Sequence, residues 1–334
     1  MTIRERQERD EEARLSPYAA LSSRSVGRAH PISTCDLRTC YQRDRDRIIH
    51  CKSFRRLKYK TQVFLTPMGD HYRTRLTHTL EVSQVARTLA RSLRLNEDLT
   101  EAAALGHDLG HTPFGHIGES TLNRLLPGGF RHNEQSLRVA ERLENDGQGL
   151  NLCRETLDGI LNHSGQNEPK TLEDWCVRRA DRIAYINHDI DDAIRGGILK
   201  PFELPRRCLS VLGETHGERI DTMIRDIVTT SMDQPFVRMS EEVRQASEEL
   251  RAFLFEYVYH DEWRKKEEAR CDYILSALYE HYLAHPEQLP AEYLEINFTE
   301  GAERAVCDFI ACMTDRYAID QFSEIFVPGA FGRR

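Results

Sequence analysis

The sequence lacks the long apolar segments that membrane insertion or secretion requires. No uninterrupted apolar run in the 334 residues exceeds five residues, whereas a membrane-spanning helix needs about 20. Residues 1–14 alternate arginine with aspartate and glutamate, where a signal peptide would carry an apolar stretch. We therefore expect no membrane segment and no secretion by that route, and we expect a cytoplasmic protein.

The sequence also lacks paired cysteines. Its nine cysteines are an odd number, and no two of them form a Cys-x-x-Cys pair. This spacing excludes the common zinc-binding and redox motifs, and it indicates reduced thiols.

An excess of positive charge is missing as well. Lys and Arg number 46 against 54 Asp and Glu, which gives a net charge of −8 and argues against a protein that coats nucleic acid. The segment 36–60 is a local exception, with nine cations, three aspartates and a net charge of +6. This segment could make a weak nucleic-acid contact or a contact between subunits, although a solvated helix surface would have the same composition.

Signals for β-strands are almost absent, because no alternating Val/Ile/Thr-rich segments separated by tight turns occur. Helical periodicity is present nearly everywhere. In the segment 76–95, an apolar stripe with helical spacing runs through Val82, Val85, Ala86, Leu89 and Leu93. Further helices are expected at 97–108, 116–126, 133–145, 153–161, 171–195, 216–232, 238–260, 265–284 and 300–318. The predicted fold class is all-α.

A Gly- and Pro-containing stretch offers the best internal boundary. Gly196-Gly197 ends an expected helix, and Pro201 to Pro205 follow. We expect a mobile N-terminal extension over 1–22, a core over 23–200 and a C-terminal helical region over 201–334 that packs on the core.

Histidine is concentrated in one part of the chain. Seven of the fourteen lie between positions 71 and 163, and imidazole and carboxylate are common ligands of divalent metals. Taken singly, these residues also have ordinary structural explanations, such as a hydrogen-bonded core histidine or a solvated acidic helix face. Together, His78, His107, Asp108 and Asp181 form the ordered series H…HD…D on three expected helices. Two imidazoles and two carboxylates would suffice to bind one divalent ion.

Longer motifs surround this series: RDRDR (43–47), FRRLKYKTQVF (54–64), RLTH (75–78), LGHDLGHTPFGHIGE (105–119), HNEQS (132–136) and ADRIAYINHD (180–189). Their combination resembles the HD-domain phosphohydrolases, and specifically the deoxynucleoside triphosphate (dNTP) triphosphohydrolases, the dGTPase-like proteins. The resemblance is dense over about 40–195 and weaker over 307–318.

The resemblance implies a helical HD-domain fold and a metal-dependent reaction. A divalent ion such as Mn, Mg or Fe, held by His78, His107, Asp108 and Asp181, would polarise a phosphate oxygen or activate water. Water would attack the α-phosphorus of a dNTP, dGTP being one candidate, and release a deoxynucleoside and intact tripolyphosphate.

The resemblance also implies roles for further residues. His116 and Glu119 match the catalytic pair of the family, in which the carboxylate orients the imidazole. Substrate contacts are expected from Gln62, Arg75, His111, Arg182, Tyr185 and Asp189. Of these, Arg75 and Arg182 would contact phosphate, and Gln62, Tyr185 and Asp189 would form the deoxyribose pocket. Glu134 is expected to support the site, and His132 and His163 could have supporting or structural roles.

Two other interpretations remain open at this point. The chain could be an HD phosphohydrolase of another phosphorylated substrate, or a nucleotide- or single-strand-binding protein with a vestigial HD site. The resemblance further suggests a homo-oligomer, commonly a hexamer.

Overall fold

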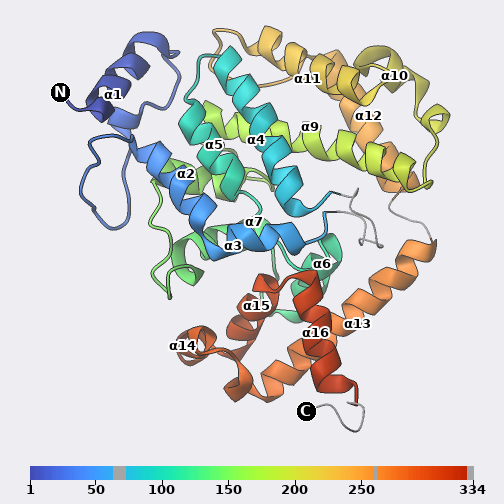
Figure 1. The fold of residues 1–334 in the computed structure, drawn as a ribbon. Helices are drawn as coiled ribbons and strands as arrows, with labels where there is room; N and C mark the ends of the chain where they lie inside the picture. Colours follow the sequence, from blue (N-terminus) through green and yellow to red (C-terminus); the bar gives the residue numbers. More distant parts are fainter. Residues whose placement is uncertain (63–72, 259–261, 329–334) are drawn as a thin grey trace.

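The computed structural model describes residues 1–62, 73–258 and 262–328, apart from the side chains of 262–264, and in them it is almost entirely helical (Figure 1). Its helices are α1 (Ile3–Arg14), α2 (Cys40–His50), α3 (Lys52–Arg56), α4 (Arg75–Ser92), α5 (Glu97–Gly106), α6 (His116–Leu125), α7 (His132–Arg138), α8 (Arg154–Asn162), α9 (Leu172–Arg195), α10 (Arg206–Leu212), α11 (His216–Ser231), α12 (Glu241–Tyr257), α13 (Glu262–Ala284), α14 (Ala291–Glu300), α15 (Ala302–Cys312) and α16 (Asp315–Phe326). Within these ranges there is no β-strand, which confirms the predicted all-α fold. Val63, Phe64 and His71 of the sequence motifs lie outside the described residues.

The central helix of the fold is α9, which packs against α4, α5, α8, α11 and α12. It begins after Thr171, whose hydroxyl accepts a hydrogen bond from the Asp174 backbone N–H and so caps the helix. The apolar stripe predicted on α4, which includes Val82 and Leu89, joins Ile183 and Ile186 of α9 in the largest core cluster. This packing fixes the faces of α4 and α9 relative to each other.

The largest core also crosses the boundary predicted near residue 201. Ile183 of α9 shares it with Met223 of α11 and Leu250 of α12. A second core joins α6 to the C-terminal helices, because Leu122 packs with Leu275, Ile310 and their neighbours. The region 201–334 therefore contacts the rest of the chain through two separate apolar surfaces.

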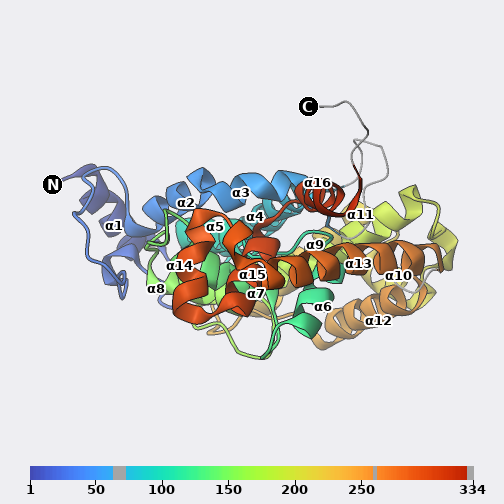
Figure 2. The ribbon, with the colours of Figure 1, turned by 90° about the horizontal axis from the view of Figure 1, so that it is seen from below.

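Residues 1–22 lie against the core and do not extend freely from it. They contain α1, and hydrogen bonds run from the Ser16 N–H to the Arg94 carbonyl (2.7 Å) and from the Ala20 N–H to Glu173 Oε1 (2.9 Å). Figure 2 shows α1 at one end of the molecule and α10 to α12 at the other. The sequence did not predict α1 because this segment has no apolar stripe, and in the structure none of its residues is buried.

The helix expected over 300–318 is in fact two helices, α15 and α16. Thr314 interrupts it with extended backbone, and its hydroxyl accepts a hydrogen bond from the Tyr317 N–H. A threonine in this position caps a new helix and does not continue the old one. The break places Asp315 at the first turn of α16, next to the loop that follows α5.

Candidate active site

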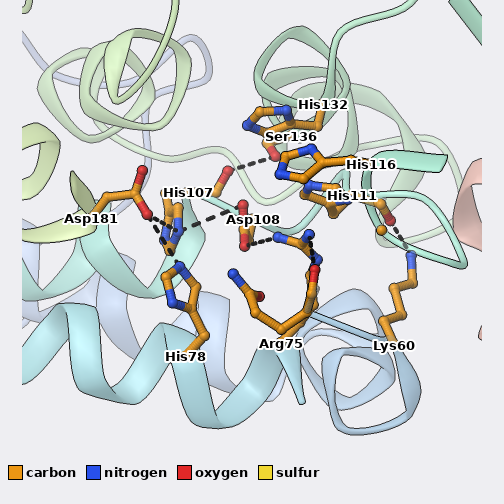
Figure 3. Close-up of polar contacts among 12 residues, drawn as sticks. Lys60, Arg75, His78, His107, Asp108, His111, His116, His132, Ser136 and Asp181 are labelled. Carbon is orange, nitrogen blue, oxygen red and sulfur yellow. Dashed lines mark hydrogen bonds and ion pairs between the residues drawn. The ribbon is translucent and has the colours of Figure 1, made fainter. Parts of the chain in front are cut away.

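The four predicted metal ligands come together at the meeting point of α4, α5 and α9. His78 lies in the first turn of α4, His107 and Asp108 follow the last residue of α5, and Asp181 lies in α9. The three helices pack on one another, which brings residues about 30 to 100 positions apart to one point (Figure 3). His78, His107 and Asp108 are buried.

The ligand atoms of this group are close to one another. One atom each from His78, His107 and Asp108 lies within 4.8 Å of the others. Asp181 joins them through Oδ1, which is 3.1 Å from His78 Nε2 and 3.9 Å from His107 Nε2. Oδ1 of Asp108 lies 3.5 Å from His107 Nε2. The structure thus unites all four residues.

The hydrogen bonds of His107 leave one nitrogen ready to bind a metal. Its Nδ1–H donates to the Ala104 carbonyl at 2.7 Å, which places the ring proton on Nδ1 and leaves Nε2 as a lone-pair donor. This Nε2 is buried and has no hydrogen-bond partner among the described residues. Because an unpaired buried nitrogen costs free energy, a divalent cation fits this position better than an empty space does.

The two carboxyl groups are ionised. Burial opposes ionisation of Asp108, but the positive charge around it, including the Arg75 guanidinium 2.7 Å away, holds the pKa of that carboxyl well below its usual range. Burial also opposes ionisation of Asp181, whose contact with His78 nevertheless lowers its pKa to about 2. Both side chains are therefore anionic at neutral pH.

A second cluster surrounds Glu119 on α6. Oε2 of Glu119 lies 3.4 Å from His116 Nδ1, as expected for the predicted pair. Oε1 makes shorter contacts of 2.8 Å with both His132 Nδ1 and the His132 backbone N–H. Burial alone would raise the pKa of Glu119, but hydrogen bonds to the two histidines lower it below its usual range. Glu119 therefore orients His132 as well as His116, a relation that the sequence did not reveal.

His163 links this cluster to the metal ligands. Its Nε2 lies 3.1 Å from His132 Nε2, its Nδ1–H donates to the Ile160 carbonyl, and its ring centroid is 4.9 Å from that of His107. Burial and the neighbouring His107 and His132 lower the pKa of His163 to about 3, so this imidazole is neutral. His132 and His163 thus form a continuous line from Glu119 to His107.

Three of the predicted substrate residues contact members of these two clusters or one another. Arg75 donates to Asp108 and, through Nη2, to the Gln62 carbonyl at 3.1 Å. His111 stacks on His132 at 4.7 Å and lies 5.5 Å from the His116 ring. Gln62 Oε1, Arg75 Nε and both ring nitrogens of His111 are buried and have no hydrogen-bond partner among the described residues. Such atoms indicate a place where a polar ligand binds.

The remaining predicted substrate residues follow Asp181 along α9. Burial raises the pKa of the Tyr185 phenol, and nearby Arg251 and Arg182 partly oppose this shift. Asp189, also buried, acts on the same phenol. The guanidinium of Arg182 lies 3.9 Å from Glu248 of α12. Arg251, also on α12, was not predicted, because its segment lies outside every recognised motif and only the packing of α12 on α9 brings it here.

A clamp from the C-terminal region holds the loop between α5 and α6. The Asp315 carboxylate accepts hydrogen bonds from the Phe114 N–H (2.9 Å), the Thr61 N–H (2.9 Å) and the Thr61 hydroxyl. Phe114 has a φ of 60°, an uncommon value for a residue with a side chain, and it is followed by Gly115 and His116. One carboxylate therefore fixes the backbone next to both Gln62 and His116.

Lys60 strengthens the same connection. Its ammonium group donates to the His111 carbonyl and, at 2.8 Å, to the Ala311 carbonyl. Burial lowers the pKa of Lys60 to about 8. Lys60 is thus unavailable for a nucleic-acid surface, although it belongs to the basic segment 36–60.

Other cations of that segment also have partners inside the protein. Arg45 lies within 3.6 Å of carboxylate oxygens of Asp46, Asp98 and Glu101, and Arg38 pairs with Asp46 at 2.6 Å. Lys52 and Lys58 are exposed. A nucleic-acid contact through this segment stays a prediction.

Comparison with known proteins places the chain in a family. The HD domain family matches residues 75–186, and the family described as phosphohydrolase-associated domain matches residues 237–324. A deoxyguanosinetriphosphate triphosphohydrolase-like protein of Caldanaerobacter subterraneus subsp. tengcongensis is 58% identical over 328 residues, which cover 98% of this chain and 97% of the relative. The chain belongs to the deoxyguanosinetriphosphate triphosphohydrolase-like family. Identically named proteins of Clostridium perfringens strain 13 and Desulfatibacillum aliphaticivorans are 51% and 48% identical, each over 98% of this chain and over 98% and 99% of their own lengths.

The matched ranges correspond to the two parts of the candidate site. The HD range of this dGTPase-like protein contains the four predicted metal ligands, and the associated range contains Arg251 and Asp315. The protein is an HD-domain hydrolase. In the part of the chain that the structure describes, no helix is long and apolar enough to cross a membrane.

Proposed function

We propose that the protein hydrolyses dNTPs to a deoxynucleoside and tripolyphosphate with the aid of a divalent metal ion. The observation that carries this proposal is the set of six unpaired buried polar atoms on five predicted site residues: Gln62, Arg75, His78, His107 and His111. A triphosphate with a sugar and a metal ion would supply partners for such a set. The names of the relatives support a dNTP, with dGTP among the candidates.

His78, His107, Asp108 and Asp181 would hold the ion. Two imidazole nitrogens and two carboxylates suit Mn, Fe or a similar ion, whereas Mg would rely more on the carboxylates. When bound, such an ion acts as a Lewis acid on a phosphoryl oxygen and lowers the pKa of water.

In the proposed reaction, water attacks the α-phosphorus and the bond between phosphorus and the 5′ oxygen breaks. His116 would donate a proton from Nε2 to the departing 5′ oxygen, because its Nδ1 faces Glu119, and the attacking water would release one proton to solvent, from which the imidazole is reprotonated. Arg75, which lies beside Asp108, would offset part of the negative charge of the triphosphate. Arg182 and Arg251, which lie near Tyr185, would offset a further part. The deoxynucleoside keeps its 5′ oxygen, and the oxygen of the attacking water becomes part of tripolyphosphate.

The test of this proposal is a panel of the four dNTPs incubated with Mn or Mg. Release of deoxynucleoside that stops when the metal is removed by a chelator supports the proposal. Turnover of another phosphorylated compound, with none of any dNTP, would assign the site to a different HD phosphohydrolase.

The sugar pocket gives a selectivity prediction. Tyr185, one turn after Asp181, would occupy the space that a 2′-hydroxyl needs, so a ribonucleotide would clash or bury an unpaired polar group at a cost of about 1 to 3 kcal/mol. We expect dGTP to be preferred over GTP by about tenfold or more in kcat/KM. Tyr185→Ala should reduce this ratio, and Asp189→Ala should raise KM at unchanged metal content. The exposed Tyr273 provides the control variant, Tyr273→Ala. Equal use of GTP and dGTP by the unmodified protein would refute the pocket assignment.

The Asp315 clamp gives a prediction about loop position. Asp315→Ala removes the acceptor of the Phe114 N–H, so His116 would shift, and we expect kcat to fall by about tenfold to a hundredfold while metal stays bound. Asp315→Asn keeps one acceptor oxygen and should recover part of the activity. Asp320→Ala, which removes an exposed carboxylate on the same helix, is the control. Wild-type kcat in Asp315→Ala would show that the loop holds its position without the clamp.

We also propose a cytoplasmic homo-oligomer, with a hexamer as the expected order. The nine free thiols support a reducing compartment, and the family resemblance supports the oligomer. Sedimentation velocity of the purified protein measures the order directly.

A further inference from the structure

A second basic site lies beside the candidate active site, between α9 and α12. It is a cavity of about 440 Å³, a size that suits a small ligand. Four arginines line it: Arg179 and Arg182 from α9, Arg244 from α12 and Arg238 from the segment before α12. None of the four predicted metal ligands, and none of the histidines around Glu119, is among its lining residues.

The carboxylates at this cavity do not balance its positive charge. Glu241 and Glu248 both pair with Arg244 at 2.6 Å, and Glu248 also lies 3.9 Å from Arg182. Four cations against two anions leave a local charge of +2. Among the described residues, neither Arg179 nor Arg238 has a carboxylate oxygen within 4.0 Å.

Both of these arginines are nevertheless held in place. Arg179 donates to the Val237 carbonyl at 3.2 Å and lies over the Trp175 ring at 4.9 Å. The guanidinium of Arg238 lies 4.0 Å from the centroid of the Phe236 ring. Arg179 therefore loses little freedom when it binds an anion, whereas Arg238 is exposed and its guanidinium rests on one aromatic ring.

The cluster is electrostatically unfavourable without an anion. Burial and the nearby Arg182 and Arg178 lower the pKa of Arg179, and the opposing effect of Glu248 is smaller. Ser240 and Ser247 also line the cavity and add hydroxyl donors. A phosphate chain is the anion that best matches several guanidinium forks and hydroxyl groups.

We propose that this cavity binds a polyphosphate, either free tripolyphosphate or the triphosphate group of a nucleotide. That this polyphosphate comes from dNTP hydrolysis rests on the proposed function, whereas the assignment of a polyphosphate as the ligand does not. Arg182 connects the two sites, because it lines the cavity and directly follows Asp181 on α9. Tripolyphosphate leaving the active site would therefore meet a second set of cations within one helical turn.

Isothermal titration calorimetry tests the proposal with inorganic tripolyphosphate and the Mn-loaded full-length protein, in excess Mn. We expect two binding events per chain, of which one is lost or at least tenfold weaker in Arg179→Gln/Arg238→Gln. Arg225→Gln, which removes an exposed arginine paired with Asp221 on α11, should retain both. Arg179→Lys/Arg238→Lys keeps the charges and should recover part of the affinity, which separates loss of charge from loss of fold.

Two outcomes would overturn the proposal: no binding of tripolyphosphate by the unmodified protein, or events in Arg179→Gln/Arg238→Gln that are unchanged in number and affinity. Competition with GTP distinguishes the sources of the ligand. Equal displacement by GTP and tripolyphosphate means that phosphate alone is recognised, and tighter binding of GTP means that a nucleotide occupies the cavity. Failure of the proposed function would appear separately, as absence of dNTP turnover with the second binding event intact.

Discussion

Asp108→Ala is expected to lose the bound metal ion and to lower dNTP hydrolysis by about a thousandfold or more. Asp108 would supply one of the two anionic ligands of the proposed ion, and its removal also takes from the buried Arg75 its carboxylate partner at 2.7 Å. Lewis-acid stabilisation by a metal contributes several kcal/mol, and each 1.4 kcal/mol corresponds to a factor of ten in rate. Metal content by mass spectrometry and kcat on the best dNTP measure the two losses.

The same loss of metal is expected for His78→Ala, His107→Ala and Asp181→Ala. Asp233→Ala, which removes an exposed carboxylate far from the site in sequence, serves as the matched control and should keep full metal content. Asp181 is the most informative of the three, because it joins the group only through its contacts with the two histidines. Full metal occupancy in Asp181→Ala would contradict the assignment of the four ligands.

His116→Ala is expected to keep the metal and to lower kcat by about a hundredfold or more, the usual scale for loss of a general acid or base. The imidazole is 3.4 Å from Glu119 and, within the described part of the chain, makes no hydrogen bond or ion pair with any of the four proposed metal ligands. Glu119→Gln should have a milder effect of the same kind. Parallel measurements of metal content and kcat in the His116 and Glu119 variants separate this role from metal binding.

The control for this second prediction is the exposed histidine of α2, replaced in His50→Ala. It should retain both metal and turnover. If His116→Ala, fully loaded with metal, turned over dNTPs at the unmodified rate, His116 would have only a structural role on the surface of α6.

The four residues of the proposed metal site could be singled out from the sequence because they lie in short motifs of metal-binding residue types. His107 and Asp108 are adjacent, and the recognised motifs contain His78 and Asp181, so the sequence identifies the residues without their distances. The tautomer of His107 could not be predicted from the sequence. It is set by the hydrogen bond from Nδ1–H to the carbonyl of Ala104, three residues earlier, which forms at the end of the helix. Helix packing then supplies the 3.1 to 3.9 Å separations.

Contacts across long stretches of chain could not be predicted. Asp315 contacts Phe114, 201 positions away in the sequence, and Thr61, 254 positions away. In the sequence, an aspartate in the first turn of a helix indicates only a favourable helix start. The short contact between Glu119 and His132 depends on the turn between α6 and α7, while the i, i+3 spacing pointed to His116 alone. The prediction of a single helix over 300–318 was wrong because the apolar stripe continues across Thr314, which in the structure caps a second helix.

In the proposed reaction, water attacks the α-phosphorus and leaves the phosphate chain intact. Each dNTP that the protein uses is to be hydrolysed in ¹⁸O-labelled water with Mn. The products are then separated by ion-exchange chromatography, and their masses are measured by mass spectrometry. Attack at the α-phosphorus predicts unlabelled deoxynucleoside and tripolyphosphate that carries one ¹⁸O atom. Orthophosphate or pyrophosphate as the first product, or ¹⁸O in the deoxynucleoside, would contradict it.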